Sequence, residues 1–109
     1  MEEAAMTAPV LFVAHPGHEL RLHHWLELTR PVVAVLTDGS GSTGVSRVPS
    51  TLAVLQATGA RAAPVMGEVT DRDVYEAVMR CDVEKAAALT VHLASVFAAA
   101  DFVVVDSWE

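Results

Sequence analysis

Four short apolar runs recur along this chain, and each lies next to turn or helix-capping residues. The runs are Val10–Ala14, Pro31–Thr37, Arg61–Met66 and Asp101–Val105. Continuous apolar runs of this length, rich in Val, are typical of strands that are buried on both faces. The segments between these runs contain helix-capping residues or apolar residues at helical spacing. The resulting order, β-α-β-α-β-α-α-β, predicts an α/β fold: a Rossmann-like parallel sheet with helices on both faces and right-handed crossovers.

Capping residues set the expected helix boundaries. A roughly helical stripe of Leu and Trp predicts a helix over His18–Thr29. Pro49 fits the first turn of a second helix, which Gly59 ends. Thr70 is expected to cap a third helix that runs to Arg80, and Asp82 a fourth that runs to about Ala100. The fourth helix is alanine-rich and apolar, so we expect it to be largely buried.

Composition excludes some classes of partner. The 109 residues suit one domain, and 52% of them are hydrophobic. The net charge of −7 argues against nucleic acid or an anionic membrane surface as the main partner, because both require clustered Lys and Arg. The acidic N-terminus does not resemble a secretory signal, and no apolar stretch has the length of a membrane helix, so a cytoplasmic location is expected. The single cysteine, Cys81, is expected to be a small buried or half-buried apolar residue.

Two histidines at the end of the first predicted strand are candidate metal ligands. His15 and His18 flank Pro16 and Gly17, and a turn there can bring both imidazoles to one point. Neutral imidazole is a good zinc ligand, and a catalytic zinc has about three protein ligands and an open position for water. Glu19 can orient such a ligand. Taken alone, two histidines at this spacing are more often ordinary polar residues at a turn and a helix N-terminus than metal ligands.

The context of these histidines resembles the PIG-L/LmbE family of zinc-dependent N-deacetylases. That family opens with a strand and an Ala-His-Pro-Asp-Asp-Glu motif, which Ala14–Glu19 matches as Ala-His-Pro-Gly-His-Glu. Leu36–Gly39 resembles the Thr-Asp-Gly that often ends the family's second strand, and Arg47 follows in the next loop as an arginine does there. Thr58–Ala60 resembles the Leu-Gly-Val that ends the family's next helix. The resemblance covers the chain from Val10 onward.

The resemblance implies a role for each matching position. His15 and His18 fall on two ligands of a zinc ion (Zn2+), with histidine replacing the family's aspartate at position 18. Gly17 occupies the position of the family's general base, and glycine cannot accept a proton. A substitute base would have to come from elsewhere, and Glu19 and Asp38 are the nearest candidates in sequence. Independently of the resemblance, Asp38 and Arg47 in the loop after the second predicted strand are candidate substrate contacts, and ordinary capping or surface roles suit them equally well. The substrate implied is a small N-acetylated amino sugar or a similar amide.

The family's third zinc ligand is a histidine in a later loop, which would follow Asp106–Glu109. We therefore expect residues 1–109 to form a single but partial domain whose third protein ligand lies beyond Glu109. An incomplete sheet leaves an unpaired edge and exposed apolar surface, so association into a homo-oligomer is also expected.

Two other functions compete with hydrolysis. The first is a non-catalytic relative that binds sugars or serves in assembly, since the base is lost at Gly17. The second is a nucleotide-binding α/β domain that uses the Gly/Ser-rich loop 39–44, which lacks the Gly-Lys-Ser/Thr ending of a phosphate loop. Of the remaining residues, His23 and His24 are expected at the surface, His92 within a helix away from the site, and Trp25 and Trp108 in the core or an interface.

Overall fold

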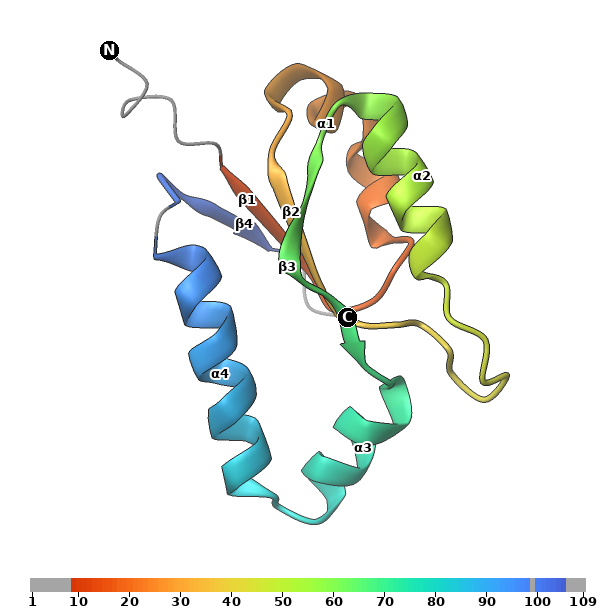
Figure 1. Cartoon of the computed structure of the whole chain (residues 1–109), viewed down its shortest axis with the longest axis vertical. Coiled ribbons are helices and arrows are strands. Elements are labelled where there is room, and N and C mark those ends of the chain that lie inside the picture. Colours follow the sequence, from red (N-terminus) through yellow and green to blue (C-terminus); the bar gives the residue numbers. More distant parts are fainter. Residues whose placement is uncertain (1–8, 99, 106–109) are drawn as a thin grey trace.

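A four-stranded, all-parallel sheet forms the centre of the molecule (Figure 1). The computed structural model describes residues 9–98 and 100–105. The strand order is β3-β2-β1-β4, and the strands are β1 (Val10–Val13), β2 (Val32–Thr37), β3 (Arg61–Val69) and β4 (Val103–Val105). The predicted α/β fold with a parallel, Rossmann-like sheet is therefore confirmed.

Helices cover both faces of this sheet, as predicted. They are the 3-10 helix η2 (His18–Leu22) and the α-helices α1 (His23–Thr29), α2 (Val48–Thr58), α3 (Asp71–Met79) and α4 (Val83–Phe97). On one face, Leu26 of α1 and Leu55 of α2 pack against the strands in the main core. On the other face, Leu93 and Val96 of α4 pack against a smaller cluster that contains Ala34. No helix among the described residues is long and apolar enough to cross a membrane.

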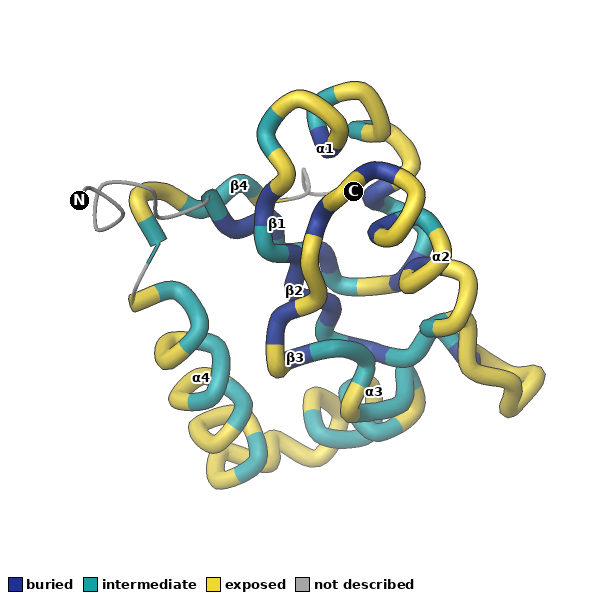
Figure 2. The backbone as a smooth tube through the Cα atoms, turned by 45° about the horizontal axis from the view of Figure 1, so that its top comes forward, coloured by how far each residue is buried: buried dark blue, intermediate teal, exposed yellow. Residues whose placement is uncertain are grey.

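The two faces are buried to different degrees. Figure 2 shows buried segments along β1, β2 and β3, whereas α3 and α4 are half-buried or exposed throughout. No residue of α4 is buried, so the prediction of a largely buried helix is wrong. The reason is that α4 contacts the sheet near its C-terminal end, where Phe97 meets Phe12 edge to face at 5.8 Å. Figure 1 shows its N-terminal half extending beyond the sheet beside α3.

The first predicted helix is divided in two. Gly17 adopts a left-handed conformation with a φ of 106°, and a 3-10 turn follows it. At Leu22 the backbone leaves helical geometry, with φ −115° and ψ 23°, before α1 begins. The apolar stripe of 18–29 therefore predicted the helical character of the segment but not its break.

The third strand is longer than predicted. It continues to Val69, and its register with β2 shifts twice, first between Val33 and Val35 and again between Val35 and Thr37, where Gly67 has a φ of 66°. Because of this irregularity Val69 still pairs with Thr37, so β2 and β3 end side by side. Their ends thus place the next residues of the chain at one edge of the sheet.

The predicted helix ends and caps agree closely with the structure, whereas the predicted burial of one cysteine does not. Gly59 ends α2 with a φ of 82°. Thr70 forms a complete capping box with Asp73, and Asp82 accepts a hydrogen bond from the amide of Lys85 at the start of α4. Cys81, however, is exposed, so the prediction of a buried or half-buried residue is wrong. It has a φ of 53° in the tight turn between α3 and α4, which lies away from both cores.

Candidate functional site

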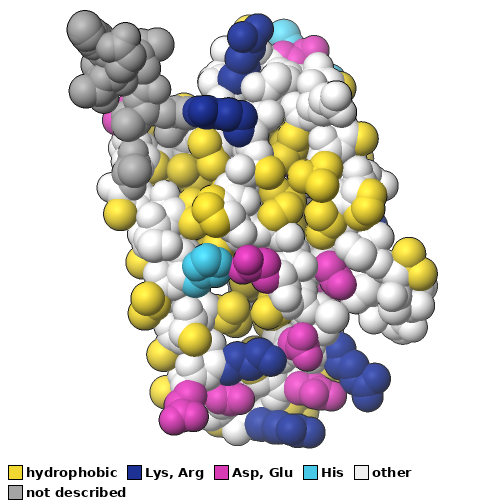
Figure 3. All heavy atoms as spheres, in the orientation of Figure 1, with side chains coloured by type: hydrophobic (Ala, Val, Ile, Leu, Met, Phe, Trp, Pro, Cys, Tyr) yellow, Lys and Arg dark blue, Asp and Glu magenta, His cyan; other side chains and the backbone are white. Residues whose placement is uncertain are grey.

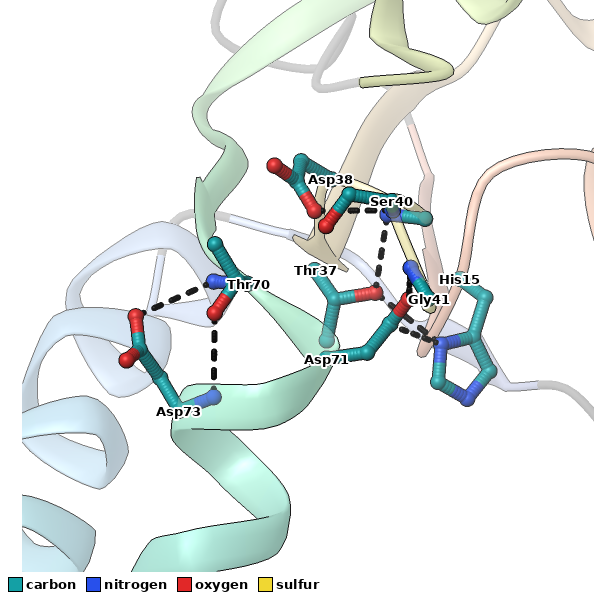
Figure 4. Close-up of polar contacts among 9 residues, drawn as sticks. His15, Thr37, Asp38, Ser40, Gly41, Thr70, Asp71 and Asp73 are labelled. Carbon is teal, nitrogen blue, oxygen red and sulfur yellow. Dashed lines mark hydrogen bonds and ion pairs between the residues drawn. The ribbon is translucent and has the colours of Figure 1, made fainter. Parts of the chain in front are cut away.

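Three side chains meet where three neighbouring strands end. His15 follows β1, Thr37 is the last residue of β2, and Asp71 follows the cap after β3. The Nδ1 atom of His15 lies 2.9 Å from Thr37 Oγ1 and 2.9 Å from Asp71 Oδ1. Figure 4 shows the three side chains pointing toward one another. The site thus lies at the carboxyl edge of the sheet, where open α/β sheets place their ligands.

The carboxylate of Asp71 is held in its ionised form. Burial raises its pKa, but hydrogen bonds from Thr37, from the Gly41 amide and from His15 outweigh that effect, so the pKa lies below its ordinary value of 3.8. The Gly41 amide donates to Oδ2 over 2.7 Å. An ionised carboxylate only accepts hydrogen bonds, so we assign the proton of a neutral His15 to Nδ1 and the lone pair to Nε2.

Asp71 is the member of this cluster that the sequence did not single out as a site residue. It lies 56 residues from His15 and is also the first residue of α3, where an acid has an ordinary explanation in the helix dipole. A signal was nevertheless present in the sequence. Thr70 marks the point where the third strand passes into a helix, and the residues after adjacent parallel strands gather at the same edge.

The two predicted metal ligands are neighbours. The rings of His15 and His18 have centroids 5.7 Å apart and planes 71° apart. Within residues 9–98 and 100–105, no group of three His, Cys, Asp or Glu side chains is arranged to hold a metal. The segment expected to precede the third ligand, 106–109, lies outside the described residues.

Glu19 supports the turn that carries these histidines. Its side chain is buried, Oε1 accepts a hydrogen bond from the Gly17 amide over 2.8 Å, and Oε2 accepts one from Thr51 Oγ1 over 2.9 Å. Glu19 therefore links the turn after β1 to α2. Both of its oxygens are engaged within the fold, and the cavity next to His15 is lined by other residues.

Asp38 and Arg47 belong to the loop after β2, which packs against the turn after β1. Asp38 Oδ1 accepts a hydrogen bond from the Ser40 amide and shapes the loop, while its carbonyl accepts one from the Arg47 amide over 2.7 Å. The Arg47 guanidinium packs against Gly17: a Cβ atom at Gly17 would lie 2.8 Å from Arg47 Nη2. The structure thus brings Arg47 to the predicted motif, whereas Figure 4 shows the Asp38 carboxylate pointing away from His15.

A cavity of about 860 Å³ opens beside the His15–Asp71 pair. Its polar wall is formed by His15, Asp71, Thr70, Arg72 and the Gly/Ser-rich loop, and its apolar wall by one face of α3. The loop residues are Ser40, Gly41, Ser42 and Gly44, and the α3 residues are Val74, Tyr75 and Val78. The volume falls within the range of small-molecule sites.

The other histidines are remote from this cavity. His23 and His24 are exposed on α1, each 3.7 Å from Glu27, as expected for surface residues. His92 lies on α4 and bonds to Glu68 Oε1 over 2.9 Å. Trp25 packs against the main core as expected, and Trp108 lies outside the described residues.

Comparison of the chain with protein-family models, with curated proteins and with solved structures found no match.

Proposed function

We propose that the chain carries part of a zinc-dependent hydrolase site of the N-acetylglucosaminyl deacetylase type, which cleaves a C–N amide bond. His15, through Nε2, and His18 would hold the metal together with a third protein ligand. The single observation that supports this most strongly is the hydrogen bond between His15 Nδ1 and Asp71, with the ring of His18 alongside.

A carboxylate behind a metal-binding histidine has a defined effect. It fixes the tautomer and the orientation of the ring and makes the outward nitrogen a stronger ligand. Asp71 is placed to act in this way on His15, and the Gly41 amide and Thr37 hold the carboxylate in turn. Zinc bound at such a site supplies Lewis acidity, which polarises an amide carbonyl.

Binding and positioning would come from the surrounding residues. Arg47 beside Gly17 offers hydrogen-bond donors to a polar substrate, and Ser40 and Ser42 contribute their polar groups to the cavity. For proton transfer, Asp38 and Glu19 are the proposed acceptors. Asp38 would need to turn from its contact with the Ser40 amide, and Glu19 would need to leave Thr51, so activity would require the site to rearrange.

The rearrangement that activity would require favours one alternative. This alternative is a non-catalytic relative that binds the same class of sugar or serves as an assembly module. Gly17 has a φ of 106°, a conformation that aspartate rarely adopts. The Arg47 guanidinium also occupies the space that a side chain at position 17 would need. The local backbone is therefore built around glycine, the residue that lacks the family's base.

A nucleotide-binding role is less well supported. A phosphate bound by the Gly/Ser-rich loop would accept hydrogen bonds from backbone amides such as that of Gly41. The Gly41 amide donates to the Asp71 carboxylate instead. A negative charge at that point opposes a second anion.

Metal binding tests the proposal directly. We expect zinc titrated into the purified full-length protein, in competition with a chromophoric chelator, to bind with a stoichiometry of one. His15→Ala should abolish binding, and Asp71→Asn should weaken it roughly 10- to 100-fold. The matched control is His24→Ala, an exposed histidine on α1, which should bind as the parent does. Equal zinc affinity in the parent and in His15→Ala would refute the proposed site.

Hydrolysis separates the two functions. Release of acetate from N-acetylglucosaminyl substrates by the zinc-loaded full-length protein, lost in His15→Ala, would support the hydrolase. Binding of the same sugars without turnover would support the binding module.

A further inference from the structure

One buried hydroxyl in the wall of the cavity is not used by the fold. Ser40 is 6% exposed and lines the cavity beside the His15–Asp71 pair. Its amide donates to Asp38 Oδ1 over 2.9 Å (Figure 4), and its carbonyl accepts a hydrogen bond from Thr43 Oγ1 over 2.8 Å. Its hydroxyl has no hydrogen-bond partner among the residues that the structure describes. Buried polar groups are almost always paired in folded proteins, so this hydroxyl indicates a partner that comes from outside the fold.

The other hydroxyls of the cavity wall differ from that of Ser40. They belong to Thr70, whose Oγ1 accepts a hydrogen bond from the Asp73 amide, and to Ser42, which is exposed and can bond to water. The backbone at Ser40 does not have a positive φ, so alanine can replace it without strain. The Ser40 hydroxyl is therefore available to a ligand and is not required by the fold.

The rest of the cavity restricts the class of ligand that can use this hydroxyl. The ionised Asp71 carboxylate in the same wall opposes an anion. Figure 3 shows acidic and basic side chains intermixed where α3 and α4 meet, rather than a basic patch. The wall contributed by α3 is apolar, and its residues are Val74, Tyr75 and Val78. A neutral ligand with hydroxyls along one edge and C–H groups on its face matches both walls, and a sugar ring has this structure.

We propose that Ser40 is a specificity-determining residue of this site and that its hydroxyl binds one ring hydroxyl of the sugar. A serine hydroxyl can both donate and accept, so it can pair with a sugar hydroxyl in either direction. Ser40 directly precedes Gly41, whose amide holds Asp71, so a sugar bound there lies next to the candidate metal site. The identity of the sugar rests on the proposed function, whereas the role of the Ser40 hydroxyl rests on its burial and its place in the cavity wall.

A double-mutant cycle between protein and ligand tests this assignment. The ligands are methyl N-acetylglucosaminide and analogues that each lack one ring hydroxyl, titrated by calorimetry into the metal-free full-length protein. Ser40→Ala should weaken binding of the complete sugar roughly three- to tenfold, because one hydrogen bond is lost. One analogue should bind the parent protein with a similar loss, and Ser40→Ala should bind that analogue as well as it binds the complete sugar.

Two controls separate this role from a structural one. Ser95→Ala removes a hydroxyl on α4 that donates to the His92 carbonyl and does not line the cavity, so this variant should bind every ligand as the parent does. In urea denaturation without ligand, Ser40→Ala should be as stable as the parent or more stable, because the hydroxyl that it removes has no partner in the described part of the fold.

Three results would overturn the proposal. One is equal affinity of the parent and Ser40→Ala for the complete sugar. Another is weaker binding by Ser40→Ala that comes with a matching loss of stability and with the same loss for every analogue, which would assign the hydroxyl to the fold. The third is binding of a nucleoside such as adenosine without binding of the sugar. Failure of the zinc site would appear separately, as absent metal binding with the Ser40-dependent sugar binding intact.

Discussion

Replacing Asp71 by asparagine removes one charge from the site while preserving the size of the side chain. The Asp71 carboxylate accepts hydrogen bonds from Thr37, from the Gly41 amide and from His15. Hydrogen bonds to a charged group contribute about 1.5–3 kcal/mol each when buried. The Asp71 side chain is 24% exposed, and an amide oxygen would still accept some of these bonds. We therefore expect Asp71→Asn to lower the free energy of unfolding by about 1–2 kcal/mol at pH 7.

The pH dependence of this loss follows from the direction of the pKa shift. The folded-state pKa of Asp71 lies below its ordinary value of 3.8, so the carboxylate stabilises the fold above that value. The contribution decreases as the pH falls through the folded-state pKa and the carboxylate takes up a proton. The difference between parent and variant should therefore be full at neutral pH and should shrink in strongly acidic solution.

Urea denaturation followed by circular dichroism, at pH 7 and at several values below 4, measures this difference. Glu84→Gln, an exposed acid in the first turn of α4, is the matched control and should change stability by a few tenths of a kcal/mol. An Asp71→Asn variant as stable as the parent at pH 7, or equally destabilised at every pH, would refute the role assigned to the carboxylate.

Two further predictions concern the supports of the site. Thr51→Val removes the hydroxyl that donates to the buried Glu19 carboxylate, so it should cost about 1–3 kcal/mol in urea denaturation; a neutral effect would show that Glu19 does not depend on this contact. Thr70→Ala removes the cap of α3 and should cost about 1 kcal/mol, whereas Thr90→Ala, inside α4, should be neutral or stabilising. Equal effects of the two threonine variants would contradict the capping role.

Most of the secondary structure could be predicted because its causes are local. A short, Val-rich apolar run such as Val10–Val13 favours a strand through its length and its β-branched side chains. Gly59 and Thr70 end or begin helices through their own conformations and hydrogen bonds. The exposure of α4 could not be predicted in this way. The apolar, alanine-rich composition of α4 suits a buried helix. Its burial, however, depends on which elements pack against it, and only its C-terminal end contacts the sheet.

The same division applies to the site. The sequence by itself determined that His15, His18 and Glu19 share one turn after the first strand, because they are chain neighbours around Pro16 and Gly17. Only the tertiary structure determined which side chains form hydrogen bonds with His15 and Glu19. Asp71 reaches His15 across 56 residues because parallel pairing, and the register shift in β3, bring three strand ends to one edge. Glu19, which by sequence was free to orient a ligand, is held by Thr51 because α2 packs beside the turn.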